Sequence, residues 1–131
     1  MISKGHVKTK AEKDWLDAVV EFGQITNWLE SKYTDFTHED GMFQIDHIIG
    51  AKAKRKVNGI TQRVGELAIM PIPMKFHESG GSHKLNRTER PANYRKEFGH
   101  EKQVWLEMIR AMQDDGYKIP FSEEVIQSII R

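Results

Sequence analysis

Apolar residues recur at helical spacing near the beginning of the chain. In residues 9–23 they lie three and four positions apart, and Thr9 followed by Glu12 has the pattern of a capping box. The apolar positions of this stripe are Trp15, Leu16, Val19, Val20 and Phe22. Gly23 is expected to end the helix, since glycine commonly follows the last helical turn. A second, short helix is expected over residues 24–33.

Two further amphipathic segments follow residue 100. Residues 101–115 form a clear stripe with Gly116 as the terminator, and another helix is expected after Ser122, a residue type that caps helix N-termini. The apolar positions are Val104, Trp105, Met108, Ile109 and Met112, then Val125, Ile126, Ile129 and Ile130. All three tryptophans lie outside the middle of the chain, so we expect the flanking helices to supply most of the core.

Period-two alternation replaces helical spacing in the middle of the chain. Residues 42–49 alternate apolar and polar side chains and predict a short strand. Residues 66–74 resume an apolar run and predict a second strand that enters a turn at Pro71 and Pro73. Two prolines make a continuous central strand improbable, because proline cannot donate to the hydrogen-bond ladder.

The remaining segments predict connections and one short helix. Residues 51–65 contain an Asn-Gly turn signal and are expected to form a long flexible connection. Residues 91–99 begin with proline and end with glycine, which favours a short helix. The whole pattern predicts a single α+β domain with helices on both sides of a small β centre.

Composition limits the chemistry and the compartment. The 131 residues include no cysteine, so disulfides and thiolate metal sites are excluded, and any metal must bind nitrogen and oxygen ligands. No segment is apolar over the length of a bilayer crossing, and the basic first residues lack the apolar core of a secretory signal. We expect a cytoplasmic protein without membrane contact.

The charge is balanced overall, at +1, but the basic residues are unevenly placed. One cluster between residues 47 and 65 contains no acid, and a second lies between residues 84 and 96. The clusters consist of Lys52, Lys54, Arg55, Lys56 and Arg63, and of Lys84, Arg87, Arg90, Arg95 and Lys96. Such clusters are typical of surfaces that bind nucleic-acid phosphates, and a solvated loop is the alternative on charge alone.

A carboxylate and three histidines lie at the end of the first predicted strand or shortly after the second. Asp46 and His47 end the first predicted strand, and His77 and His83 follow the second. A divalent ion among Asp46, His77 and His83 would bind a phosphate oxygen and stabilise the leaving oxygen of a phosphodiester. His47 points to the other side of the strand, because adjacent strand residues alternate. It is left to take a proton from water, which suits an imidazole near neutral pH.

Five landmarks occur in a fixed order along the middle of the chain. They are Asp46-His47, "TQR" at 61–63, "AIMPI" at 68–72, "FHESGGSH" at 76–83 and "YRKEFG" at 94–99. Their order and spacing resemble the HNH, or His-Me finger, nucleases, and within that group the phage recombination-enhancement (Ref) nucleases. The resemblance covers roughly residues 43–109.

The resemblance implies a fold and a set of site residues. The fold is a small ββα-metal core over residues 42–99, between a helical part at 9–36 and helices at 101–131. His47 would be the general base, with Asp46, His77 and His83 around the metal. Two departures stand out: the family's cysteines are absent, so its structural zinc is not expected, and Glu66 falls near the middle Asn of the motif. Glu66 either orients His47 or lies on the surface.

The predicted function is a metal-dependent DNA endonuclease. The ion would be magnesium, manganese, nickel or zinc, one per site. The basic clusters would contact the DNA backbone through Lys52, Lys54, Arg55, Lys56, Arg63, Lys84 and Arg87. The resemblance suggests phage or mobile-element DNA metabolism in a bacterial cytoplasm, with a recombination or other phage protein as a partner. A monomer would nick one strand, and a homodimer would cut both.

Two alternatives remain at this stage. The first is a non-catalytic DNA-binding module that keeps the HNH fold, which the substitutions at the Asn and cysteine positions motivate. The second is a structural zinc site built from histidines, which predicts that removing the metal unfolds the chain.

Overall fold

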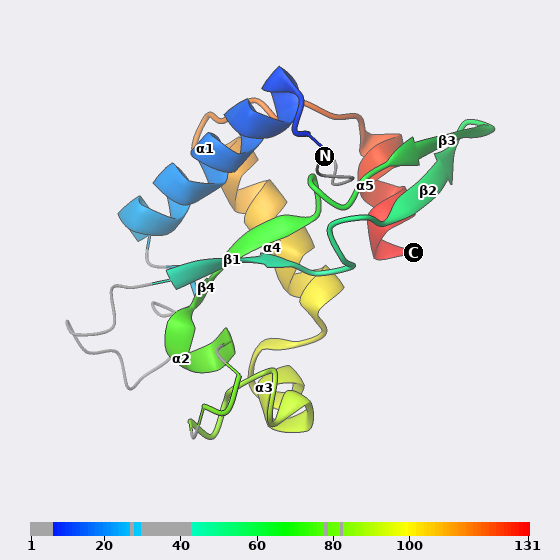
Figure 1. Cartoon of the computed structure of the whole chain (residues 1–131). Helices are drawn as coiled ribbons and strands as arrows, with labels where there is room; N and C mark the ends of the chain where they lie inside the picture. Colours follow the sequence, from blue (N-terminus) through cyan, green and yellow to red (C-terminus); the bar gives the residue numbers. More distant parts are fainter. Residues whose placement is uncertain (1–6, 27, 30–42, 78, 82) are drawn as a thin grey trace, which may run out of the picture.

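The protein is a mixed α+β structure, as the pattern predicted. A computed structural model describes residues 7–26, 28–29, 43–77, 79–81 and 83–131. The elements are α1 (Lys10–Thr26), β1 (Phe43–His47), β2 (Lys54–Val57), β3 (Ile60–Arg63), β4 (Ile69–Pro73), α2 (Met74–His77), α3 (Pro91–Phe98), α4 (Glu101–Asp114) and α5 (Glu123–Ile130). Within these residues the strands form two antiparallel pairs, β1 with β4 and β2 with β3, among the helices (Figure 1).

Helix α1 begins as predicted but ends later. The capping box is present: the Thr9 N–H donates to Glu12 Oε1 (2.9 Å), and the Glu12 N–H donates to Thr9 Oγ1 (3.1 Å). The prediction that Gly23 ends the helix was wrong, because α1 continues to Thr26. A Cβ at Gly23 would lie 2.8 Å from the Cβ of Pro71, so this glycine lets the helix pack closely against β4. Of the separate helix predicted at 24–33, residues 24–26 belong to α1, and residues 27 and 30–33 lie outside the described residues.

Strand β4 contains both prolines, which were expected to turn the chain. Pro73 is opposite Phe43 and Pro71 is opposite Ile45 in the pairing with β1. The Ile48 N–H donates to the Ala68 carbonyl (3.0 Å), and hydrogen-bonded positions alternate along an antiparallel pair. The prolines therefore occupy positions where a missing N–H costs no ladder bond, which a two-stranded sheet tolerates.

The connection between β1 and β4 is a β-hairpin, so the predicted long flexible connection was wrong. The Asn-Gly turn signal is realised there, with φ of 51° at Asn58 and 81° at Gly59. The hairpin packs against α5: Val57 is buried, and the Arg55 Nε–H donates to the Ser128 carbonyl (3.2 Å). Figure 1 shows the hairpin extending away from the rest of the molecule beside α5.

The core lies between β4 and the long helices. All five residues of β4 are buried, and both α1 and α4 contact it. Phe121, between α4 and α5, packs edge-on against Trp15 at 5.2 Å between ring centroids and stacks on Trp105 at 6.2 Å. The predicted cap at Ser122 is present, since its side chain accepts from the Val125 N–H. No helix among the described residues combines the length and apolar character that crossing a membrane requires.

Gly65 lies where two loops are in close contact, and its substitution tests this packing. A Cβ at Gly65 would lie 2.2 Å from the Gly50 carbonyl oxygen and 2.4 Å from that of Ala51. Because backbone atoms cannot give way as a flexible side chain does, Gly65→Ala is expected to lower the free energy of unfolding by about 3 kcal/mol. Urea denaturation measures the loss.

Gly50→Ala is the control for that substitution. A Cβ at Gly50 meets nothing within 4 Å, but its φ of +94° strains any other residue. Its cost is expected to be about 1 kcal/mol. Equal losses in the two variants would show that the contact between the loops carries no weight.

Candidate active site

His47 and Glu66 form a hydrogen-bonded pair at one end of the β1–β4 sheet. His47 Nε2 lies 3.0 Å from Glu66 Oε1, and the second oxygen, Oε2, lies 3.2 Å from Lys8 Nζ. The His47 side chain is 32% exposed, whereas the Glu66 side chain is 9% exposed. A carboxylate only accepts hydrogen bonds, so Nε2 carries the hydrogen and Nδ1 of the neutral ring keeps a lone pair. Glu66 therefore holds the imidazole of His47 in one orientation, and solvent can reach the ring.

Backbone hydrogen bonds explain why Glu66 meets His47. The bond from Ile48 to Ala68 continues the β1–β4 ladder beyond His47. The Ala68 N–H in turn donates to the Val64 carbonyl (3.1 Å), which closes a turn that contains Glu66. Glu66, which the resemblance places near the Asn of the HNH motif, thus lies within reach of the histidine. Lys8 was not anticipated, because nothing in its local sequence distinguishes it from other exposed lysines.

Asp46 and His77 meet on the other face of β1. His77 Nε2 lies 3.6 Å from Asp46 Oδ1, and His77 Nδ1 lies 2.5 Å from Gln44 Oε1. Gln44 and Asp46 are two residues apart in the strand and therefore share a face. Because the amide oxygen of Gln44 can only accept, the His77 Nδ1 carries a hydrogen, and Nε2 is the ring nitrogen that faces the carboxylate. Sequence reasoning missed Gln44, although its spacing from Asp46 was a usable signal.

Arg87 connects Asp46 to the start of α4. Its Nη2 donates to Asp46 Oδ2, and its Nη1 lies 3.3 Å from Glu101 Oε1. Arg95 also binds Glu101 with two nitrogens, at 3.0 and 3.1 Å. The Arg87 side chain is only 20% exposed. Sequence reasoning assigned Arg87 to DNA contact, but here its terminal nitrogens engage carboxylates, and a role in binding DNA stays a prediction.

Burial and these partners act in opposite directions on the two carboxyl groups. Burial raises the pKa of Asp46 above its ordinary value, and the charges of Arg87 and His77 offset only part of that rise. Burial also acts to raise the pKa of Glu101, but hydrogen bonds and charge from Arg95 and Arg87 outweigh it and leave that pKa lowered. Glu101 is therefore the firmly ionised anchor of the network.

His83 lies apart from the Asp46–His77 pair. Its Nδ1 accepts from the Leu85 N–H (3.0 Å), and its ring packs edge-on against Phe76 at 5.0 Å between centroids. In the part of the chain that the structure describes, no three His, Asp or Glu side chains are grouped so that they could hold one ion. The three-residue metal set expected from the sequence is not assembled, and only two of its members meet.

The two members that meet still fit a divalent cation. Asp46 offers a carboxylate oxygen, and the Nε2 of His77, which faces it, offers a lone pair when the ring is neutral. A ligating histidine commonly donates its other N–H to an oxygen, as His77 does to Gln44. Two protein donors suit an ion that keeps several water ligands, such as magnesium or manganese.

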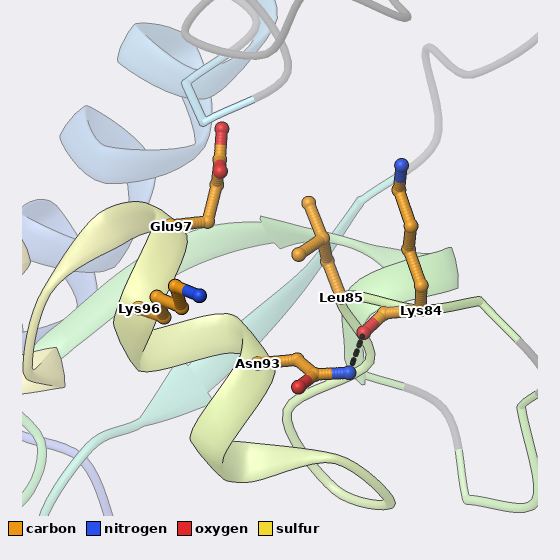
Figure 2. A pocket seen from close by; sticks show the side chains of 5 residues that line it. All are labelled: Lys84, Leu85, Asn93, Lys96 and Glu97. Carbon is orange, nitrogen blue, oxygen red and sulfur yellow. Dashed lines mark hydrogen bonds between the residues drawn. The ribbon is translucent and has the colours of Figure 1, made fainter.

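The second basic cluster borders a pocket next to α3. The pocket, of about 340 Å³, is lined by Lys84, Leu85, Asn93, Lys96 and Glu97. Figure 2 shows the Asn93 side chain donating to the Lys84 carbonyl, at 3.1 Å, which ties the helix to the preceding loop. Lys84 is exposed, as its predicted DNA contact requires, but that contact itself stays a prediction.

No family model, no curated protein and no solved structure matches the chain. The resemblance to the HNH nucleases therefore depends on residues of this chain alone. The family, the metal and the activity stay predictions, and the arrangement of the site provides the physical basis for proposing them.

The ion-pair network around Glu101 predicts a pH-dependent contribution to stability. At pH 7, Glu101→Gln is expected to lower the free energy of unfolding by about 2 kcal/mol, since it removes a buried partner of two arginines. Because the pKa of Glu101 is lowered on folding from 4.5, this stability is present above about pH 4.5 and is lost as the pH falls through the folded value. Urea denaturation from pH 7 to pH 3 should show the two proteins converging in acid.

Glu97→Gln provides the matched control. Glu97 is an exposed acid of α3, and its substitution is expected to change the free energy of unfolding by less than about 0.5 kcal/mol at either pH. A difference between Glu101→Gln and the unmodified protein that stays constant with pH would contradict the assignment of Glu101 as an ionised anchor.

Proposed function

We propose that the protein is a metal-dependent DNA endonuclease of the HNH type. The observation that carries the proposal is that two neighbouring residues at the end of β1, Asp46 and His47, have different partners on different faces of the strand. His47 is held by Glu66 on one face, and Asp46 meets His77 on the other. An oriented imidazole base and a pair of metal ligands, set on neighbouring residues of one strand, are groups that metal-assisted phosphodiester hydrolysis uses. In this proposal β1, β4 and the helices after β4 form the ββα-metal core.

His47 acts as the general base. A water at Nδ1 transfers its proton to the imidazole while its oxygen attacks the phosphorus. The bond between phosphorus and the leaving oxygen breaks, and the leaving alkoxide takes a proton from solvent. Glu66 keeps the hydrogen on Nε2, so that Nδ1 is the nitrogen that accepts the proton, and its charge stabilises the imidazolium that forms. Lys8 holds the other oxygen of Glu66 in place.

Asp46 and His77 would hold the divalent ion. Once bound, the ion would supply positive charge that stabilises the phosphate and the leaving oxygen. Gln44 binds the hydrogen on Nδ1, which leaves Nε2 as the ligand nitrogen of His77, and Arg87 orients the Asp46 carboxylate. His83, which lies outside the pair, stays a predicted ligand without geometric support.

One observation favours the non-catalytic alternative. The Arg87 guanidinium already neutralises Asp46 by direct contact, so the carboxylate has a partner without any metal. A module that kept the fold to bind DNA and lost the chemistry would be expected to show such a contact. Measuring DNA binding and nicking separately distinguishes the two functions.

Plasmid nicking by purified protein tests the catalytic proposal. Supercoiled DNA is incubated with EDTA, magnesium, manganese, nickel or zinc, and nicked product is quantified on a gel. Nicking is expected with at least one ion and not with EDTA. His47→Ala is expected to lower the rate by about 10²–10⁴-fold, because general-base catalysis contributes that much, while DNA binding persists.

His100→Asn is the control for loss of a histidine. His100 caps α4 by accepting from the Lys102 N–H, and asparagine preserves that cap, so nicking should be unchanged. Binding without nicking under every condition would support the non-catalytic module. Unfolding on addition of EDTA, followed by circular dichroism, would instead indicate a structural metal site.

The Glu66 contact makes a second prediction. Glu66→Gln keeps an oxygen that can accept from His47 but removes the charge, and Glu66→Ala removes both. Nicking rates are expected to fall in the order unmodified, Gln, Ala, with a loss of about tenfold or more for alanine. Rates equal to the unmodified protein in both variants, with unchanged unfolding midpoints, would show that Glu66 has no part in the reaction.

A further inference from the structure

The β2–β3 hairpin sorts its side chains onto two faces. Lys54 is opposite Arg63, and Lys56 is opposite Thr61 in the pairing of the strands. Directly opposed residues lie on the same face of an antiparallel pair, and alternate residues of one strand share a face. Three cations and a threonine therefore form one face, and all four side chains are exposed. No acidic residue occurs in the hairpin.

The other face packs against α5 and contains the remaining cation. Val57 is buried there, and Arg55 is partly buried, with its Nε–H donating to the Ser128 carbonyl at 3.2 Å. Arg55 also donates from Nη1 to the Lys54 carbonyl at 2.9 Å. Its hydrogen bonds go to backbone oxygens, so Arg55 anchors the hairpin to the body of the protein.

Two acids of α5, one of them paired with Arg110, lie on the side of the hairpin that packs against the helix. The first turn of α5 carries Glu123 and Glu124, and both line a pocket of about 260 Å³ that Lys56 and Asn58 of the hairpin border as well. The pKa of Glu123 is lowered to about 2 by its hydrogen bonds from Arg110 and Gln127. Packing against α5 occupies the face of Val57 and Arg55. Lys56 borders the pocket, but alternation along β2 sets its side chain on the opposite face, and that opposite face is the one available to a polyanion.

The base of the hairpin is joined to the candidate active site. The N–H groups of Val64 and Gly65 both donate to the Ala53 carbonyl, at 2.9 and 3.2 Å. This link lies immediately before Glu66, the partner of His47. A nucleic acid bound along the hairpin would therefore extend from the turn that carries Glu66, the partner of His47.

We infer that the outward face of the hairpin, formed by Lys54, Lys56, Thr61 and Arg63, binds the phosphate backbone of duplex DNA. A two-stranded ribbon has a width that the major groove admits, and Figure 1 shows the hairpin at the edge of the molecule beside α5, with its turn extending outward. The choice of DNA as the polyanion depends on the proposed nuclease function. The finding that Arg55 lies on the other face of the hairpin does not depend on that function.

Salt-dependent binding to a fluorescent DNA duplex of about 20 base pairs tests the inference. Anisotropy is measured with the metal-free protein in EDTA, so that no cleavage occurs. Each phosphate contact contributes about 0.9 to the slope of log K against log salt. Lys54→Gln combined with Lys56→Gln is expected to reduce that slope by about 2, and Arg63→Gln alone by about 1. Both are expected to weaken binding at low salt.

Two controls separate local contact from overall charge and from folding. Lys13→Gln combined with Lys118→Gln removes the same charge from exposed positions outside the hairpin, and its slope should match the unmodified protein. Arg55→Lys keeps the charge but loses the hydrogen-bonding geometry of the guanidinium. It is expected to lower the unfolding midpoint while leaving the slope unchanged.

The outcomes distinguish this inference from the nuclease proposal. A slope that is unchanged in the hairpin variants, while the unmodified protein binds and nicks DNA, overturns the hairpin surface and leaves the nuclease standing. A reduced slope in the hairpin variants supports the surface even if the protein never nicks DNA. Equal losses in the hairpin and Lys13–Lys118 variants would reduce the effect to overall charge and overturn the inference. Absence of duplex binding by the unmodified protein overturns both.

Discussion

The antiparallel pairing of β1 with β4 is the constraint on which the candidate site depends. It sets Asp46 opposite Met70 and His47 opposite Ile69. Since side chains alternate across a strand, two neighbouring residues of β1 serve two different faces, one with His77 and the other with Glu66. A shift of the register by one residue would exchange the faces and separate both pairs. The buried apolar side chains of β4 resist such a shift, because it would also move them away from α1 and α4.

On each face of β1, a polar side chain is held by a partner that is itself buried or half-buried. On one face the buried Asp46 carboxylate is compensated by Arg87, which in turn depends on Glu101 at the start of α4. On the other face Glu66 divides its oxygens between His47 and Lys8. An unpaired carboxylate at either position would be costly, so the same contacts that stabilise the fold also orient the side chains proposed to do the chemistry.

Local sequence patterns identified most elements because their causes are local. The capping box at Thr9, the cap at Ser122 and the Asn-Gly turn at residues 58–59 each involve residues a few positions apart, and all three are present. Gly23 misled because its role is tertiary: it accommodates Pro71, which is distant in the sequence. The local sequence around the Asn-Gly turn predicts only a flexible connection, because the surface against which its hairpin packs is α5, far along the chain.

The sequence by itself determined the α+β class, the strand that ends in Asp46-His47, the basic clusters and the pairing of residue types suited to phosphodiester chemistry. Only the tertiary structure decided which of these residues meet. It joined His77 to Asp46 and left His83 against Phe76, directed Arg87 to carboxylates, and separated Arg55 from the other cations of its hairpin. The physical reason is that residue types and local periodicity are properties of neighbouring residues in the sequence. These contacts instead join side chains from distant segments, which only the packing around β4 and α5 brings together.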